Sequence, residues 1–395
     1  MNAVDKTTKS DHSNSDLKLV HASPIRPPMD YSSCTAFFKS ISARWKSIWT
    51  KQFVLSLLYG QILSVCIACT SVATTELVDR GLSLPTMQNN FLYFLLFATY
   101  TPYTMYKYGP KGWVELVKRD GWKYFILAAC DVEANFLVVK AFSYTDLLSC
   151  MLLDAWAIPI CLFFSWVYMR VKYHWTQILA IILQSVMICI VGQGLLVTSD
   201  ILTGKNWAGP NKGIGDALLI AGATLYGFTN ATEEFLARKR PLYEVIGQLG
   251  MFGFIINGIQ ASALEYDLVK NGNWNGTTAG LLLAYTSAML ILYTLAPILF
   301  RLSSSAYFNL SSLSRSFYGL LFGLLLFRSK PYWLYFVSQV IVVFGLVAYF
   351  WSSAPEEQGI VDSQTPGYIV MESGNVNKAK NAYESGITTT EVCSV

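Results

Sequence analysis

The segment QFVLSLLYGQILSVCIACTSVAT, residues 52–74, contains no charged side chain. A helix rises about 1.5 Å per residue, so roughly 20 apolar residues cross the hydrocarbon core of a bilayer. A helix also pairs its own backbone groups, which have no water to bind in lipid. These residues therefore predict a transmembrane helix.

Nine further apolar stretches of similar length follow the first. They are approximately residues 88–107, 122–143, 146–169, 175–197, 213–236, 243–263, 279–300, 304–327 and 331–351. The whole chain is 53% hydrophobic and 14% charged, whereas a soluble domain carries about 25% charged residues. We therefore expect an all-α polytopic membrane protein with ten transmembrane helices.

Polar segments flank the apolar part of the chain. Residues 1–51 and 352–395 are predicted to be cytoplasmic tails, largely disordered because they hold few apolar side chains. Within the first tail, residues 36–50 place aromatic and basic side chains at helical spacing. This pattern indicates either an amphipathic helix in the headgroup layer or a simple juxtamembrane linker.

Lysine and arginine are concentrated in alternate loops. The connections after the second, fourth, sixth and eighth apolar stretches carry eleven basic residues, and the opposite loops carry seven. Because basic loops stay on the cytoplasmic side, both termini are predicted to be cytoplasmic. The sequon Asn275-Gly-Thr277 then lies in a non-cytoplasmic loop, where Asn275 is a glycosylation candidate.

A short pattern occurs twice along the chain, as Arg170-x-Lys172-x-x-Trp175 and Arg328-x-Lys330-x-x-Trp333. Each copy introduces the last helix of a possible five-helix half. We expect halves at residues 52–197 and 213–351, joined by a non-cytoplasmic linker at 198–212. Two halves of five helices are inverted in the membrane, which is the architecture of alternating-access carriers with a site near the midplane.

Ionisable groups within spans cost roughly 2.5–3.5 kcal/mol each on insertion scales, so each is a candidate functional residue. Asp131 and Asn135 are four residues apart and share a helix face, while Glu133 points away. These residues either line a cavity or form a structural ion pair. Lys140, near the end of the same helix, is predicted to reach the surface or to pair with an acid.

Two later spans carry further candidates. Asp154 and Trp156 precede Pro159, which permits a kink, and they serve either binding or helix packing. In the span at 213–236, helical spacing places four polar candidates on one face: Tyr226, Asn230, Glu233 and Glu234. The adjacent carboxylates suit gating or proton coupling, or else an interfacial ion-pair cluster beside Arg238-Lys-Arg240.

The span at 304–327 is rich in serine and also holds Asn309 and Arg315. Small hydroxyl residues let helices approach closely, so the serines are explained by packing. Arg315 instead needs an acidic partner, and Asp131, Glu133 and Asp154 are the candidates. Tyr285 and Tyr293, in the preceding span, are interpreted as packing residues.

Catalytic signatures are absent from the sequence. No HExxH, G-x-S-x-G or phosphate-loop pattern occurs, and the eight cysteines show no metal-ligand spacing. We therefore expect a protein that is not an enzyme and that has no metal or cofactor. A net charge of +4 is too small to indicate nucleic-acid binding.

Several motifs resemble those of one known family, over about residues 52–350. They are Asp131-Val-Glu-Ala-Asn135, Lys140-Ala-Phe-Ser-Tyr-Thr145, Leu152-Leu-Asp154, Glu233-Glu234 and Gly250-Met-Phe-Gly253. The chain resembles the F branch of solute carrier family 35, in the drug/metabolite transporter superfamily. The resemblance implies ten helices as two inverted repeats, alternating access, and uptake of the micronutrients queuine and queuosine. One departure is Ser314-Arg315-Ser316, where relatives tend to carry an acid.

Other functions remain open at this stage. A nucleotide-sugar exchanger of the Golgi would need cationic side chains for two phosphates, yet most charges within the spans are acidic. A non-transporting receptor or scaffold would not depend on the acids at all. The resident membrane is either the plasma membrane or the Golgi. The expected partners are a small-molecule substrate, the lipid bilayer and, as a further candidate, a second copy forming a homodimer.

Overall fold

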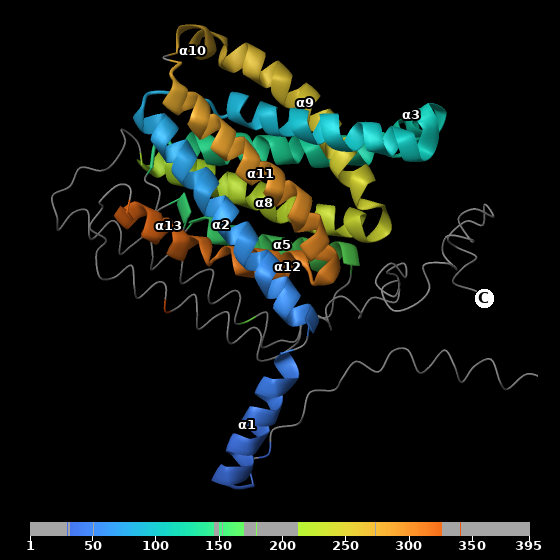
Figure 1. Ribbon diagram of the computed structural model, residues 1–395, viewed down its shortest axis with the longest axis vertical. Coiled ribbons are helices and arrows are strands. Elements are labelled where there is room, and N and C mark those ends of the chain that lie inside the picture. The colour runs from blue at the N-terminus through green and yellow to red at the C-terminus, as the bar shows by residue number, and fades with distance from the viewer. Residues whose placement is uncertain are drawn as a thin grey trace, which may run out of the picture. The chain divides into compact units, whose positions relative to one another are not determined.

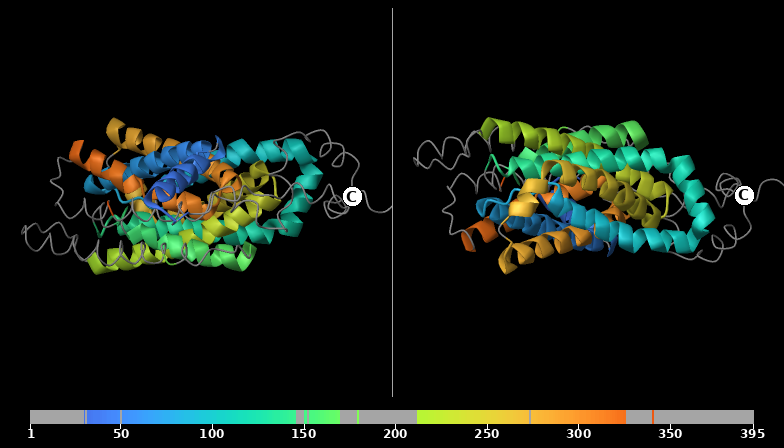
Figure 2. Two further views of the ribbon diagram at one scale, coloured as in Figure 1. Left: turned by 90° about the horizontal axis from the view of Figure 1, so that it is seen from below. Right: turned by 90° about the horizontal axis from the view of Figure 1, so that it is seen from above.

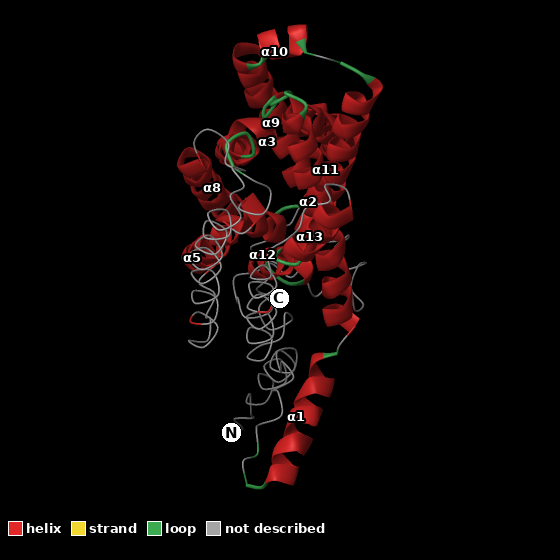
Figure 3. Cartoon of the chain, turned by 90° about the vertical axis from the view of Figure 1, so that its left-hand side faces the viewer, coloured by secondary structure: helices red, strands yellow, loops and turns green. Residues whose placement is uncertain are grey.

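The computed structural model describes residues 30, 32–49, 51–145, 150–151, 153–169, 179, 212–272, 274–325 and 340. Every regular element in these residues is helical, and Figure 3 shows no strand in this part of the chain. The predicted fifth and tenth spans, the linker at 198–212 and the tail at 352–395 lie almost entirely outside the described residues.

The chain divides into two compact units, residues 1–54 and 55–395. In the first unit, α1 spans Cys34–Ile48, and the Ser33 hydroxyl caps it by accepting from the Ala36 N–H at 3.1 Å. A residue whose side chain accepts this bond is a strong helix start signal. The Trp45 and Trp49 rings lie 6.3 Å apart, and both are about half exposed. A helix therefore occupies the predicted segment, and its place in the headgroup layer stays a prediction.

The second unit is a bundle of helices (Figure 1). In chain order it contains most of α2 (Lys51–Asp79), α3 (Met87–Ala141), the 3₁₀ turn η1 (Asp154–Trp156), α5 (Ala157–Met169), α8 (Lys212–Lys239), α9 (Leu242–Leu264), α10 (Tyr266–Asn271), α11 (Gly276–Leu302), α12 (Ser305–Ser312) and α13 (Arg315–Leu325).

Among the described residues, three helices are long and apolar enough to cross a membrane: Phe53–Asp79, Leu242–Leu264 and Gly276–Leu302. Asp154–Met169 is a shorter apolar helix. The all-α membrane character is therefore confirmed for this part of the chain. The number of ten spans is not decided by these residues.

The helix α3 contains two of the predicted spans. Its backbone leaves the helical region at Gly109, where φ is +73°, a value that glycine adopts without a steric cost. Pro110 follows and cannot donate a helical hydrogen bond. The two arms, corresponding to the predicted spans 88–107 and 122–143, run in opposite directions from this bend (Figure 2).

Two predicted spans are interrupted. The break in the span at 304–327 corrects the sequence prediction, whereas the irregularity near Asp154 is where a kink before Pro159 was expected. The span predicted at 304–327 divides into α12 and α13, with a turn at Leu313 and Ser314. Within the span predicted at 146–169, the 3₁₀ turn η1 directly precedes α5. Pro159 lacks the N–H that would bind the Ala155 carbonyl, which explains the second irregularity.

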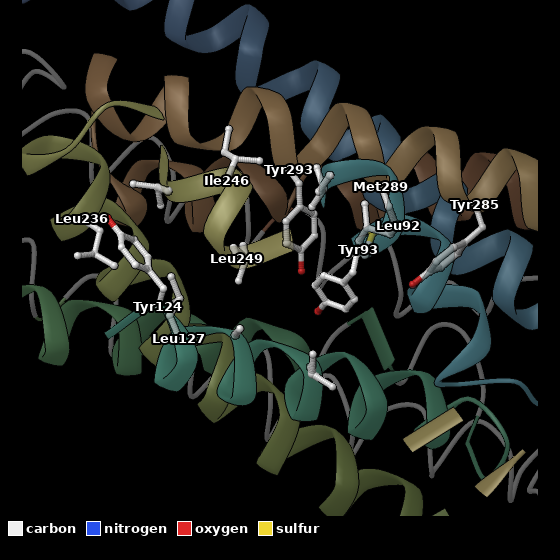
Figure 4. Packing of buried hydrophobic residues seen from close by; sticks show 14 of the residues in the cluster. Leu92, Tyr93, Tyr124, Leu127, Leu236, Ile246, Leu249, Tyr285, Met289 and Tyr293 are labelled. Atoms are coloured by element: carbon white, nitrogen blue, oxygen red, sulfur yellow. The ribbon is translucent and has the colours of Figure 1, made fainter. Parts of the chain in front are cut away.

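The close packing of α9 against α3 depends on glycine. A Cβ atom built at Gly250 would lie 2.6 Å from the Phe97 nitrogen and 2.7 Å from the Leu96 Cβ. At Gly253 it would lie 2.5 Å from the Tyr93 ring. Because these positions carry no side chain, α9 packs directly against Tyr93 in the core cluster shown in Figure 4.

A buried acid also fixes the start of α3. Glu265, at the end of α9, accepts hydrogen bonds from the backbone N–H groups of Thr86 at 2.6 Å and Met87 at 2.8 Å. The first N–H groups of a helix lack partners within the helix, and a carboxylate there satisfies them. The Asn257 amide donates to the Thr86 carbonyl at 2.7 Å, so α9 holds this end of α3 at three points.

We predict that Gly250→Ala lowers stability by about 1–3 kcal/mol, because the added methyl group overlaps backbone that cannot move aside. Gly258→Ala is the matched control on the same helix, since a Cβ there meets one atom at an ordinary 3.6 Å. Thermal unfolding of the two purified variants in one detergent tests this. Equal melting temperatures would contradict the packing described here.

Candidate functional site

A cavity of about 130 Å³ lies within the second unit. It is lined by side chains from α2, the second arm of α3, η1, α5, α8, α11, α12 and α13. The residues predicted from the sequence that line it are Asp131, Asn135, Asp154, Tyr226, Asn230, Glu233, Asn309 and Arg315. Residues far apart in the sequence therefore meet at one polar cavity.

Asp131 is held by tyrosines from two other segments. The Tyr93 and Tyr293 hydroxyls donate to its Oδ2 at 2.7 and 2.8 Å, and Figure 4 shows both rings directed at the second arm of α3. Asn135 donates to the Tyr293 hydroxyl at 2.9 Å and accepts from Tyr226 at 2.8 Å. This network joins α3, α8 and α11 through neutral donors to one carboxylate.

Arg315 pairs with Asp154, one of its three predicted partners. The Arg315 side chain is only 8% exposed, and a second nitrogen donates weakly to the Met151 carbonyl at 3.4 Å. Removing either member of such a buried pair leaves an uncompensated charge, which is strongly unfavourable. The pair ties α13 to the irregular start of the fourth predicted span.

The adjacent acids of α8 have different surroundings. Glu234 forms an ion pair with Arg238 at 2.7 Å and accepts from the Ser305 N–H at 2.9 Å. Glu233 lines the cavity instead, and its Oε1 accepts no hydrogen bond from the described residues. The ion-pair interpretation therefore holds for Glu234, whereas Glu233 belongs to the cavity.

Asn230 and Asn309 connect α8 to α12 at the cavity wall. The Asn230 amide donates to the Asn309 Oδ1 at 3.2 Å, and the Asn309 amide donates to the Ser305 carbonyl at 2.8 Å. Small serines on α12 bring the two helices close enough for this contact, as expected for membrane helix packing.

Besides Glu234, three candidate residues lie outside the cavity lining. Glu133 accepts a hydrogen bond from Gln260 of α9. This agrees with the helix periodicity, which predicted that Glu133 points away from the face of Asp131. Trp156 donates to the Thr224 hydroxyl at 3.2 Å. Lys140 lies in the last turn of α3. None of the three belongs to the lining of this cavity.

The sequence missed the tyrosines that complete the site. Tyr285 and Tyr293 line the cavity, although packing alone was predicted for them. Tyr93 was not singled out, because a tyrosine within an apolar span gives no sign of the acid across the helix interface. The hydrogen bonds of their hydroxyls identify them: Tyr93 and Tyr293 donate to Asp131, and Tyr285 donates to Asn89.

An ion network lies at the end of the predicted span 122–143, where α3 and α9 meet the loop at Arg240, and its central acid, Asp120, is outside that span. Asp120 accepts from Lys123 at 2.8 Å and from Arg240 at 2.7 Å. Partial burial raises the pKa of Asp120, but hydrogen bonds from Lys123 and Arg119 outweigh this and hold its pKa below the usual value. The acid is therefore ionised, and the network is structural.

The sequence model of solute carrier family 35, the SLC35F group, matches residues 49–351. A solute carrier family 35 member of Schizosaccharomyces pombe, C320.08, described as uncharacterized, is 37% identical over 86% of this chain and 69% of its own length. Solute carrier family 35 member F2 of Mus musculus is 34% identical, over 77% of this chain and 80% of that protein. The Xenopus tropicalis protein of the same name is 32% identical, over 78% and 79%.

One solved crystal structure superposes with a TM-score of 0.52 at 14% identity, covering 75% of this chain and 96% of that chain. This likeness concerns the fold alone. The family match, in contrast, extends from the start of α2 to beyond the last described helix and includes every residue that lines the cavity. The chain belongs to the F branch of solute carrier family 35, whose members are membrane transporters.

Proposed function

We propose that this solute carrier moves queuine and queuosine across its membrane by alternating access, as a secondary-type carrier. The observation that carries the proposal is the charge of the cavity. Among its described lining residues, Asp131, Asp154 and Glu233 face a single cation, Arg315. Because Asp154 pairs with Arg315, two carboxylates remain for a solute that brings positive charge.

The chemistry of these micronutrients matches the polar groups present. Each has a purine-like face, hydroxyls and a cationic secondary amine. Carboxylates attract the amine, amides such as Asn135 and Asn230 offer both donors and acceptors, and tyrosine rings suit a flat base. Trp156 lies outside the cavity lining, so Tyr226 and Tyr285 of the cavity wall are the rings proposed to stack on the base.

The same charges argue against a nucleotide sugar. Two phosphates buried in a cavity require cationic partners or backbone donors. Arg315 is the lining cation in the described residues, and Asp154 already neutralises it. A nucleotide-sugar exchanger would have to break this ion pair and also accept repulsion from Asp131 and Glu233.

The position of the cavity supports an inverted-repeat carrier. Its lining comes from residues 67–157 and from residues 219–315, and these belong to the two halves predicted at 52–197 and 213–351. Sites between repeats, near the midplane, are typical of carriers of this architecture. The ten-helix arrangement, cytoplasmic termini, and a plasma-membrane or Golgi location are part of the same proposal.

The direct test is uptake of labelled queuine into cells that lack this protein, with and without its re-expression. We expect re-expression to restore saturable uptake that neither guanine nor nucleotide sugars compete. Equal uptake in the two cell lines would show that queuine is not the substrate, while the assignment as a solute carrier would stand.

Asp131→Asn should reduce that uptake by about tenfold or more, because hydrogen bonds to a charged group contribute about 1.5–3 kcal/mol. Glu133→Gln is the matched control, since this acid lies two residues away but faces α9. Surface labelling shows whether both variants reach the membrane equally. Normal uptake by Asp131→Asn at equal abundance would contradict the assignment.

The ion pair gives a second prediction. Arg315→Leu or Asp154→Ala alone should cost about 3–5 kcal/mol, because each leaves one buried charge without its partner. The double change Asp154→Ala with Arg315→Leu should recover much of this loss. Thermal unfolding in detergent measures all three, and additive losses in the double variant would show that the two side chains do not interact.

Orientation is tested at Asn275. This exposed residue caps α11, and its Oδ1 accepts from the Thr278 N–H at 2.9 Å, which leaves the amide nitrogen free for a glycan. We expect a glycosidase to increase the gel mobility of the protein from cells, and Asn275→Gln to abolish the effect. An N-glycan attached elsewhere would require the predicted topology to be revised.

A further inference from the structure

The three acids among the described residues that line the cavity are not equivalent. Asp131 accepts from the hydroxyls of Tyr93 and Tyr293, and Asp154 pairs with Arg315. Glu233 has neither kind of partner among the described residues: it forms no ion pair there, and its Oε1 accepts no hydrogen bond. The side chain nevertheless lines the cavity and is only 8% exposed.

An unpaired buried carboxylate is unfavourable, because desolvation removes water without offering a replacement. The nearby cations do not relieve it. Arg238 is engaged by Glu234 at 2.7 Å and donates to the Ser303 carbonyl at 2.8 Å. Arg315 is engaged by Asp154. Neither arginine is left to pair with Glu233 among the described residues, and the side chain faces the cavity, so a cation in the cavity is placed to be its partner.

We infer that Glu233 is the residue that binds the cationic amine of the transported solute, and that Asp131 is a positioning residue. The inference rests on the proposed function and narrows the substrate class to solutes with a protonated amine. It replaces the gating or coupling role that the sequence suggested for Glu233. Asp131 acts through Tyr93, Tyr293 and Asn135, whose hydrogen bonds set the shape of the cavity.

The same free carboxylate suggests a rival role, in which Glu233 carries a coupling proton and does not touch the solute. The two roles predict different effects of a Glu233 substitution on charged and neutral solutes. An amine-binding Glu233 distinguishes charged from neutral solutes, whereas a proton carrier affects all transported solutes alike.

The test uses purified full-length protein and two ligands with one base. Queuine carries the cationic side chain, and 7-deazaguanine has the corresponding bicyclic base without it. We expect Glu233→Gln to weaken queuine binding by about tenfold or more while 7-deazaguanine binding stays unchanged. Asp131→Asn should weaken both ligands by a similar factor, because it disturbs the cavity wall and not the amine contact.

Glu234→Gln is the control for a neighbouring acid, because that residue is paired with Arg238 and lies outside the cavity lining. It should lower thermal stability without changing the ratio of the two affinities. Equal weakening of both ligands by Glu233→Gln would overturn the inference. So would unchanged queuine binding combined with loss of accumulation driven by a pH gradient.

Failure of the substrate proposal can be separated from failure of this inference. If the unmodified protein binds neither ligand, thermal stabilisation by propylammonium is compared with stabilisation by propanol. Selective stabilisation by the ammonium that Glu233→Gln abolishes would uphold a cation site even though queuine is not the solute. Equal stabilisation by the two compounds would overturn the cation site as well.

Discussion

The structure depends on the requirement that polar groups buried between membrane helices find partners there. Asp131 meets it through the hydroxyls of Tyr93 and Tyr293, and Asn135 continues the network to Tyr226. One carboxylate thereby joins α3, α8 and α11, and the space beside it is the cavity. The close approach of α9 at Gly253 fixes Tyr93 in position. The packing of the core therefore also determines the geometry of the cavity, because Tyr93 and Tyr293 belong to the core cluster and orient Asp131.

The other buried charges fall into two groups. Glu234 with Arg238, and Glu265 with the start of α3, are satisfied within the protein and hold helices together. Glu233 is not satisfied among the described residues, although it neighbours Glu234 in the sequence. In a carrier, an unmet charge facing a cavity is useful, since a solute that supplies the missing partner gains binding energy that other solutes do not. The family shows that the chain is a transporter, and the distribution of charge suggests which solutes it selects.

Within the described residues the sequence predicted where most of the helices lie, because a run of about 20 apolar residues specifies a spanning helix without information from the rest of the chain. It also predicted that Asp131 and Asn135 share a face apart from Glu133, since helix periodicity alone decides this. It narrowed the partner of Arg315 to three acids, but it could not decide which side chains meet across helices. Trp156, a candidate from the sequence, is therefore not among the residues that line the cavity, and Tyr93 was missed. The break at Leu313 and Ser314 escaped notice because neither residue is a helix breaker. The ten-helix count and the inverted repeat stay predictions.

The most direct test of the central claim is an experimental structure of the full chain with queuine bound, determined by electron cryomicroscopy. The account predicts density for the base inside the cavity, with the secondary amine within hydrogen-bonding distance of the Glu233 carboxylate and the tyrosine contacts of Asp131 intact. Density for the solute outside this cavity, or an amine directed at Asp131 with its tyrosine bonds broken, would contradict it.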